Sequence, residues 1–248
     1  MDLHLTGLKA LIIGGTRGIG RATARLLAAE GATVAFCGRG KQAVDALAAD
    51  IPGSVGFVAD AGGDAAAFKS ATEGAIASLG GLDILVTCQT ASGMKFDEAG
   101  FRENFEVDVI GTYRAIEVAL PHLKQSAHPS VVNIASIAAL EEFGGPQSFN
   151  SMKTATIVYL HQLAHAHAPV RFNSVSPGPI YEKEGPWGWV EANMPEVFAG
   201  TKKSIPAGRY GLPEEVAAAV AYLSSPLAAF VSGTNLVIDG AAKKAVQF

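Results

Sequence analysis

The sequence predicts a single-domain α/β fold: a doubly wound sheet of about seven parallel strands with helices on both faces. Short apolar runs without charge alternate with longer helical patterns along the whole chain. Uncharged strands that alternate with helices are typical of a parallel sheet covered on both faces. No break in composition divides the 248 residues. Because α/β folds of roughly 250 residues commonly form one unit, we expect one domain over residues 1–248.

The elements follow in a regular order. The first unit is a buried-strand pattern at Lys9–Gly14, a glycine-rich turn, and Arg21–Glu30, which is rich in helix formers. Six further strands are expected at residues 33–37, 55–58, 83–87, 130–135, 170–175 and 235–239. Five further helices are expected at residues 41–50, 65–79, 101–123, 151–167 and 213–223. This alternation is what a doubly wound sheet requires.

Residues 178–207 interrupt the alternation with prolines and aromatic side chains, among them Trp187 and Trp189. Connections of this length are usually functional loops. We expect an insertion in the domain, and two interpretations stay open. It is either a partly helical flap over a substrate pocket or a segment whose aromatic rings pack against another subunit. The flap and residues 93–96 together predict an apolar or aromatic pocket.

Composition and charge exclude several classes of protein. The chain is 49% apolar and 17% charged, which is ordinary for a globular protein and unlike a disordered one. A formal net charge of -4 supplies no basic surface for a phosphate backbone, so we expect no nucleic-acid partner. No stretch reaches the roughly 20 apolar residues of a membrane-spanning helix, so we expect no membrane partner either.

Cysteine use and the N-terminus point to one compartment. Cys37 and Cys88 are too few and too far apart for a disulfide framework or a CxxC metal site, which is typical of a reducing environment. Residues 1–6 show no basic segment followed by an apolar one, so no secretory signal is recognised. We expect a soluble cytoplasmic protein.

A glycine-rich turn lies directly between the first strand and the first helix. It runs from Gly14 through Gly15 to Gly20, and its expected cofactor contacts are Gly14, Thr16, Arg17, Gly18, Ile19 and Gly20. Glycines allow a tight turn and close approach of the backbone to a ligand, and the following helix N-terminus offers free N–H groups to a pyrophosphate. This position is what a dinucleotide site requires, so the expected fold is Rossmann-like.

The end of the second strand selects between the two nicotinamide cofactors. An NAD site normally places a carboxylate there, which accepts a hydrogen bond from the ribose 2′-hydroxyl. This strand is followed instead by Gly38, Arg39 and Gly40. The guanidinium of Arg39 suits a 2′-phosphate, and Arg17 adds a second positive charge nearby. We therefore expect NADP(H) as the cofactor.

These features and later ones resemble the short-chain dehydrogenase/reductase family, of the kind that includes 3-oxoacyl-carrier-protein reductases. The resemblance covers essentially the whole chain. The matching segments are Gly14-(x3)-Gly18-Ile19-Gly20, Val58-Ala59-Asp60, Asp83-Ile84-Leu85-Val86, Val132-Asn133-Ile134-Ala135-Ser136, Phe149-(x3)-Lys153, Arg171-Phe172-Asn173-Ser174-Val175-Ser176-Pro177-Gly178 and Gly233-(x5)-Asp239-Gly240. The resemblance implies a homotetramer or dimer, and hydride transfer between a nicotinamide and a small carbonyl or alcohol substrate.

The resemblance also implies the roles of particular residues. Ser136 would hydrogen-bond the substrate oxygen, and Lys153 would hold the nicotinamide ribose and lower the pKa of a neighbouring phenol. That phenol is missing, because the family's tyrosine, four residues before Lys153 and on the same helix face, is Phe149. The other implied cofactor contacts are Asp60, Ala61, Cys88, Pro177, Gly178 and Ile180.

Phe149 keeps the aromatic ring and removes the group that donates a proton when a carbonyl is reduced. Loss of a positioned general acid typically costs on the order of 10²- to 10⁴-fold in rate, so we expect this chain to bind cofactor well and turn over poorly. One explanation is an engineered Tyr-to-Phe form of an active reductase. The retention of Ser136 and Lys153 favours that explanation.

The other explanation is that Phe149 is native. The chain would then be a catalytically silent NADP(H)-binding sensor or scaffold, or a reductase with a different proton donor. Tyr181, Asp108 and a lysine-bound water are the candidate donors. A substrate with different proton demands, such as an imine, is a further alternative.

Three further positions depart from the family. Asp108 aligns with an asparagine of the family's fourth helix, and it joins the candidate catalytic residues because a carboxylate there still accepts hydrogen bonds. Thr87–Thr90 replaces the family's Asn-Asn-Ala-Gly, which alters the cofactor contacts of that loop. Glu182 takes the place of a threonine, where a carboxylate could accept from the nicotinamide amide.

Two remaining features have structural interpretations. His161 and His165 lie four residues apart on one expected helix, but no carboxylate stands at ligand spacing. We therefore expect packed or surface histidines and no metal. The tail, residues 241–248, ends in an apolar residue. The resemblance implies that it reaches a neighbouring subunit, and a frayed terminus is the alternative.

Overall fold

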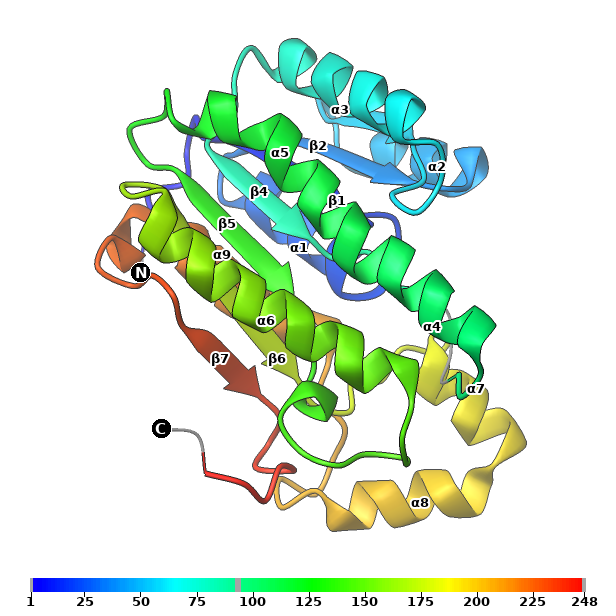
Figure 1. The fold of residues 1–248 in the computed structure, drawn as a ribbon. Coiled ribbons are helices and arrows are strands. Elements are labelled where there is room, and N and C mark those ends of the chain that lie inside the picture. Colours follow the sequence, from blue (N-terminus) through cyan, green and yellow to red (C-terminus); the bar gives the residue numbers. More distant parts are fainter. Residues whose placement is uncertain (1, 92–94, 247–248) are drawn as a thin grey trace.

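The computed structural model describes residues 2–91 and 95–246, which form one seven-stranded parallel sheet covered by helices (Figure 1). The strands are β1 (Lys9–Ile13), β2 (Thr33–Gly38), β3 (Val55–Val58), β4 (Ile84–Thr87), β5 (Ser130–Ile134), β6 (Arg171–Pro177) and β7 (Asn235–Ile238). Their order in the sheet is β3-β2-β1-β4-β5-β6-β7. The predicted doubly wound fold is confirmed.

Successive residues of the buried strands face opposite sides of the sheet, and each side packs against its own helices. Leu11 and Ile13 of β1 belong to one core, and Ala10 and Ile12 belong to the other. The first core is covered by α3 (Ala65–Leu79), α5 (Gly111–Leu123) and α6 (Ser148–Ala166). The second is covered by α1 (Gly18–Ala29), α2 (Lys41–Asp50) and α9 (Pro213–Ser224). Both faces of the sheet are buried in apolar cores, which explains why the strands carry almost no charge.

The helix expected over residues 101–123 is interrupted by a π-helical turn. The chain forms α4 (Glu98–Asn104), then the π turn η1 (Phe105–Ile110), then α5. A π turn inserts an extra residue and is frequent at functional sites. Gly111 follows it in tight packing, because a Cβ there would lie 2.9 Å from the Cβ of the buried Ala61. Within η1, Asp108 is buried.

The insertion at residues 178–207 contains two short helices, α7 (Pro186–Asn193) and α8 (Pro195–Ser204). Each begins with a proline, whose fixed φ suits the first helical position. The ring of Phe198, in α8, stacks on that of Tyr210 with centroids 4.5 Å apart. Trp189 is 60% exposed, so its role as flap or interface residue stays a prediction.

None of the helices in the described ranges combines the length and the hydropathy that crossing a bilayer demands.

Candidate active site

The site residues expected from the sequence lie where the strands end. Gly14 follows β1, Cys88 follows β4, Ser136 follows β5, and Gly178 follows β6. Strand order changes direction between β1 and β4, and ligands of open α/β sheets bind outside the carboxyl ends of the strands at such a switch point. The topology therefore brings these four distant positions to one edge.

The glycine turn has a backbone that only glycine fits. Gly14 and Gly18 have φ values of +80° and +54°, in the left-handed region that glycine adopts without strain. A Cβ on Gly14 would lie 2.8 Å from the backbone N of Gln89, and a Cβ on Gly20 would overlap the carbonyl oxygen of Gly14. This close-packed turn before a helix N-terminus fits the pyrophosphate of a dinucleotide.

A carboxylate of the chain itself lies against this turn. Glu182 accepts a hydrogen bond from Gly18 N at 3.2 Å and forms an ion pair with Arg21. A carboxylate at a helix N-terminus is electrostatically favourable. Glu182 belongs to the 178–207 insertion, so the contact joins that segment to the glycine turn. Sequence reasoning placed Glu182 near the nicotinamide amide and missed this contact.

The cations expected at the adenosine end are exposed. Arg17 is the N-cap residue of α1, and Arg39 follows the last residue of β2. A Cβ on Gly38 would lie 2.5 Å from Oγ1 of Thr16, so the glycine turn packs directly on the end of β2. Asp60, after β3, is exposed as well. This edge therefore offers two guanidinium groups to a ligand phosphate.

The chain after β6 lies at the same edge of the sheet. Pro177 is the last residue of β6, and Gly178 N donates to the carbonyl of Ile238 at 2.9 Å. Ile180 forms an isolated parallel bridge with Gly211. These contacts fix the start of the 178–207 insertion beside the glycine turn.

Ser136, Phe149 and Lys153 come from β5 and α6. Ser136 is the N-cap residue of η2 (Ile137–Ala139), and its Oγ accepts from Ala138 N at 3.1 Å. Phe149 lies in the first turn of α6, and Lys153 lies one turn later. The Lys153 Nζ is 5.7 Å from the centroid of the Phe149 ring, a cation–π distance. The ring therefore lies beside the ammonium.

The Lys153 ammonium has a carboxylate partner, Asp108, at an N···O distance of 2.9 Å. The two side chains are 5% and 0% exposed. Nζ also donates to the carbonyl of Ile134 at 3.0 Å. Asp108 accepts from Asn104 Nδ2 at 2.9 Å and from Ala91 N at 3.3 Å. The site thus contains a buried ion pair, each member of which is hydrogen-bonded to neighbouring groups.

Sequence reasoning named Asp108 and Lys153 separately and missed their contact. It also missed Asn104, whose Oδ1 accepts from Ser148 Oγ at 2.7 Å and so ties α4 to the start of α6. One feature of the sequence could have indicated the contact: an acid occurs at position 108, and the fold buries a lysine at position 153.

The thiol of Cys88 is a weak nucleophile. Burial raises the pKa of its thiol to about 11, although the nearby Lys153 charge acts in the opposite direction. Burial also raises the pKa of Cys37 to about 12. Both thiols are therefore protonated near neutral pH, and only the thiolate is a strong nucleophile. The interpretation of Cys88 as a small packing residue beside the cofactor site agrees with these values.

Tyr181 is engaged elsewhere in the insertion. Its hydroxyl donates to Glu191 Oε2 at 2.6 Å, and this hydrogen bond to a carboxylate raises the pKa of Tyr181. It is therefore a weaker acid than an ordinary tyrosine. Of the pocket expected near residues 93–96, positions 93 and 94 lie outside the described residues. Phe96 is 60% exposed.

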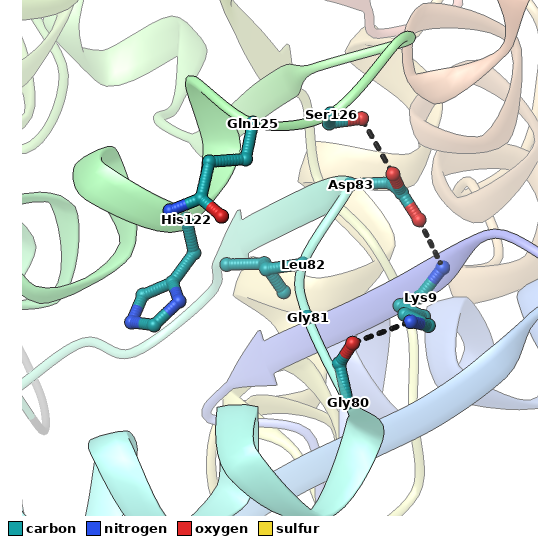
Figure 2. Close-up of a pocket in the computed structure, with 8 residues that line it drawn as sticks. All are labelled: Lys9, Gly80, Gly81, Leu82, Asp83, His122, Gln125 and Ser126. Carbon is teal, nitrogen blue, oxygen red and sulfur yellow. Dashed lines mark hydrogen bonds between the residues drawn. The ribbon is translucent and has the colours of Figure 1, made fainter.

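Two surface hollows lie away from the ion pair. Figure 2 shows one of about 210 Å³ at the opposite edge of the sheet, where Lys9 Nζ donates to the carbonyl of Gly80 at 2.6 Å and Ser126 donates to Asp83. These polar groups hydrogen-bond to one another at the start of β1 and β4. The other hollow, of about 510 Å³, is lined by residues 95–103 and includes Phe96. Phe96, which was expected at the substrate pocket, thus lines a surface hollow.

The histidines have structural partners. The ring of His161 meets that of His165 edge to face at 5.0 Å, and its Nδ1 lies 2.9 Å from the carbonyl oxygen of Gly233. Across residues 2–91 and 95–246, no group of three or more His, Cys, Asp or Glu side chains could hold a metal ion. The tail bonds within its own chain, since Lys244 N donates to Glu141 at 3.0 Å.

Comparison with known proteins gives consistent matches over the whole chain. A family model described as enoyl-(acyl carrier protein) reductase matches residues 14–242. Isoepoxydon dehydrogenase of Aspergillus clavatus is 34% identical, with 98% of each chain covered. The 3-oxoacyl-[acyl-carrier-protein] reductase of Aquifex aeolicus is 30% identical, over 97% of this chain and 99% of the other. A solved structure titled short chain dehydrogenase/reductase family protein is 36% identical, with a TM-score of 0.81 over 97% of this chain and 98% of the other.

Proposed function

The chain belongs to the short-chain dehydrogenase/reductase family, and we propose that it is an NADP(H)-dependent oxidoreductase with weakened proton transfer. It would reduce a small carbonyl compound or oxidise the matching alcohol. The observation that carries the proposal is the arrangement of Ser136, Phe149 and Lys153 beside a dinucleotide-type glycine turn. Phe149 supplies no exchangeable proton, which is the reason for a slow reaction.

The residues have separate tasks in this proposal. The bound nicotinamide supplies or accepts the hydride. Gly14, Gly18 and Gly20 allow the backbone to approach the pyrophosphate. Ser136 hydrogen-bonds the substrate oxygen, and Lys153, whose Nζ donates to the Ile134 carbonyl and lies 2.9 Å from the Asp108 carboxylate, would hold the nicotinamide ribose.

Hydride transfer itself can be tested on the parent protein. Incubation with deuterium-labelled NADPH and a panel of carbonyl compounds, including a 3-oxoacyl thioester, is expected to yield deuterated alcohol slowly. Isoepoxydon with NADP⁺ tests the oxidative direction. The panel follows the substrates named in the two relatives. Binding of NADPH without product from any substrate would instead support the second candidate.

The second candidate is a catalytically silent NADP(H)-binding sensor or scaffold. The buried Asp108–Lys153 pair favours it, because a lysine held by a carboxylate has a reason to persist without catalysis. The labelled-product experiment separates the two functions, since it detects turnovers too slow for a spectrophotometric assay.

Arg39→Asp is expected to weaken NADPH binding by about 10- to 100-fold while leaving NADH binding within a fewfold. The guanidinium would otherwise form charge-assisted hydrogen bonds with the 2′-phosphate, worth about 1.5–3 kcal/mol. Fluorescence titration with each dinucleotide measures both constants. Arg25→Asp is the matched control, because Arg25 pairs with Asp50 on the surface. An unchanged NADPH affinity in Arg39→Asp would remove the basis for NADP(H) preference.

Glu182→Gln is expected to tighten dinucleotide binding about two- to fivefold, an effect typical of one charge at a helix N-terminus. The carboxylate accepts from Gly18 N and pairs with Arg21, the groups that a pyrophosphate would approach. The same titration measures the change, with Glu184→Gln as control on the exposed part of the loop. Weaker binding in Glu182→Gln would show that Glu182 supports the cofactor.

A further inference from the structure

Two departures from the family converge on one side chain. Lys153 Nζ lies 2.9 Å from a carboxylate oxygen of Asp108 and 5.7 Å from the ring centroid of Phe149. The acid comes from the π turn η1, and the ring comes from the same helix as the lysine. Both changes therefore act on the charge that the family uses to activate its phenol.

We propose that Asp108 is a positioning residue that neutralises Lys153, so that position 149 no longer receives the positive field a catalytic phenol needs. The proposal rests on the function proposed above and extends it: in the oxidative direction the loss of proton transfer has two causes, and only one of them is the missing hydroxyl. Restoring the hydroxyl alone would give a phenol of ordinary acidity.

The field at position 149 depends on its distance from each charge. A nearby ammonium favours the charged form of a phenol, and a nearby carboxylate disfavours it. Here the opposite charges lie 2.9 Å apart, and the ring centroid is 5.7 Å from Nζ. From position 149 the pair acts as a dipole whose field falls off faster than that of a single charge.

The other groups around Lys153 do not restore the lost charge. Ile134 contributes a carbonyl that accepts from Lys153, and Asn104 and Ala91 contribute a neutral amide and a backbone N–H that donate to Asp108. Cys88 is protonated, with its pKa raised by burial. Among the described residues, those hydrogen-bonded to either member of the pair, Ile134, Asn104 and Ala91, add no further charge.

The geometry of Asp108 also shows that it holds Lys153 in place. Its other oxygen accepts from Asn104 and Ala91, so the carboxylate is fixed from α4 and from the chain after β4. Lys153 is in turn fixed by the Ile134 carbonyl at the end of β5. An asparagine at position 108 would keep the shape and an acceptor oxygen while removing the negative charge.

The test is an ultraviolet difference titration of the phenol introduced by Phe149→Tyr, alone and with Asp108→Asn. In Phe149→Tyr the introduced phenol is expected to titrate near the ordinary tyrosine value of about 10. In Asp108→Asn/Phe149→Tyr it is expected to titrate about one to three units lower, the usual effect of an unpaired neighbouring cation. Subtraction of the matching Phe149 proteins removes the signal of the five native tyrosines.

The matched control is Asp50→Asn/Phe149→Tyr, which removes a carboxylate of the surface pair with Arg25 and is expected to titrate like Phe149→Tyr. The proposal is overturned if the phenol of Phe149→Tyr is already well below the ordinary value, or if Asp108→Asn leaves it unchanged. The first outcome needs only the single variant, so it remains decisive if the double variant does not fold.

This experiment requires neither cofactor nor substrate. The titration therefore tests the neutralisation of Lys153 by Asp108 independently of the proposed reaction. The phenol titrations can follow the expectation while none of these variants forms deuterated product. In that case Asp108 remains the neutralising residue, and the oxidoreductase function is rejected.

Discussion

Lys153→Met is expected to lower the free energy of unfolding by about 3–5 kcal/mol, the usual cost of breaking a buried ion pair by removing one partner. The Asp108 side chain is 0% exposed, and the ammonium lies 2.9 Å from it. The donors that would remain, Asn104 Nδ2 and Ala91 N, are neutral. Equilibrium unfolding in urea, followed by circular dichroism, measures the loss.

Two comparisons separate the buried charge from other effects of this substitution. Lys41→Met breaks a surface pair with Asp45 whose side chains are 78% and 59% exposed, so its cost is expected to be about 0–1 kcal/mol. Asp108→Asn/Lys153→Met removes both charges and is expected to recover most of the loss. A Lys153→Met variant as stable as Lys41→Met would mean that Asp108 does not depend on its partner.

The pattern of apolar runs predicted the fold well because the information is local and repeated. The inner strands are buried on both faces, as Leu11 and Ile12 of β1 show, so uncharged runs mark these strands directly. Right-handed crossovers also restrict the order of seven parallel strands to few topologies, although the order itself comes from the structure. The glycine turn was recognisable for the same reason, because strand, turn and helix are contiguous.

The contacts that characterise the site are not local. Asp108 and Lys153 are 45 positions apart, and Glu182 meets Gly18 across 164 positions. The π turn that contains Asp108 depends on tertiary packing, such as the contact of Gly111 with Ala61. Residues 101–123 show one uninterrupted helical pattern, so nothing in that pattern indicates where an extra residue enters the helix.

The structure gives Ser136 and Lys153 structural roles, which bears on the origin of Phe149. Ser136 and Lys153 favoured an engineered origin of Phe149 because a chain without the chemistry has no chemical reason to keep them. Both have structural partners here: Ser136 caps η2, and Lys153 balances Asp108. Their retention is therefore equally compatible with a native Phe149, and the matched change at position 108 is a second departure that a single Tyr-to-Phe edit does not account for.

Phe149→Tyr is expected to raise the rate of carbonyl reduction by on the order of 10²- to 10⁴-fold, the usual contribution of a positioned general acid. Reduction requires the protonated phenol, and a phenol with an ordinary pKa of about 10 is protonated at neutral pH. NADPH oxidation in the presence of the carbonyl substrate measures the gain. Phe143→Tyr places a hydroxyl in the loop before α6 and is expected to gain nothing. Equal rates for the two variants would remove Phe149 from the catalytic position.

Alcohol oxidation by the same variants has a different requirement, because the phenol must first lose its proton. With a pKa of about 10, only about one phenol in a thousand is ionised at pH 7. A shift of about two units in Asp108→Asn/Phe149→Tyr raises that fraction about 100-fold, so oxidation near neutral pH is expected to need both substitutions. The pH profile of the oxidation rate should then move by the same number of units as the phenol titration. Profiles that coincide in the single and double variants would show that Asp108 does not control the acid–base group.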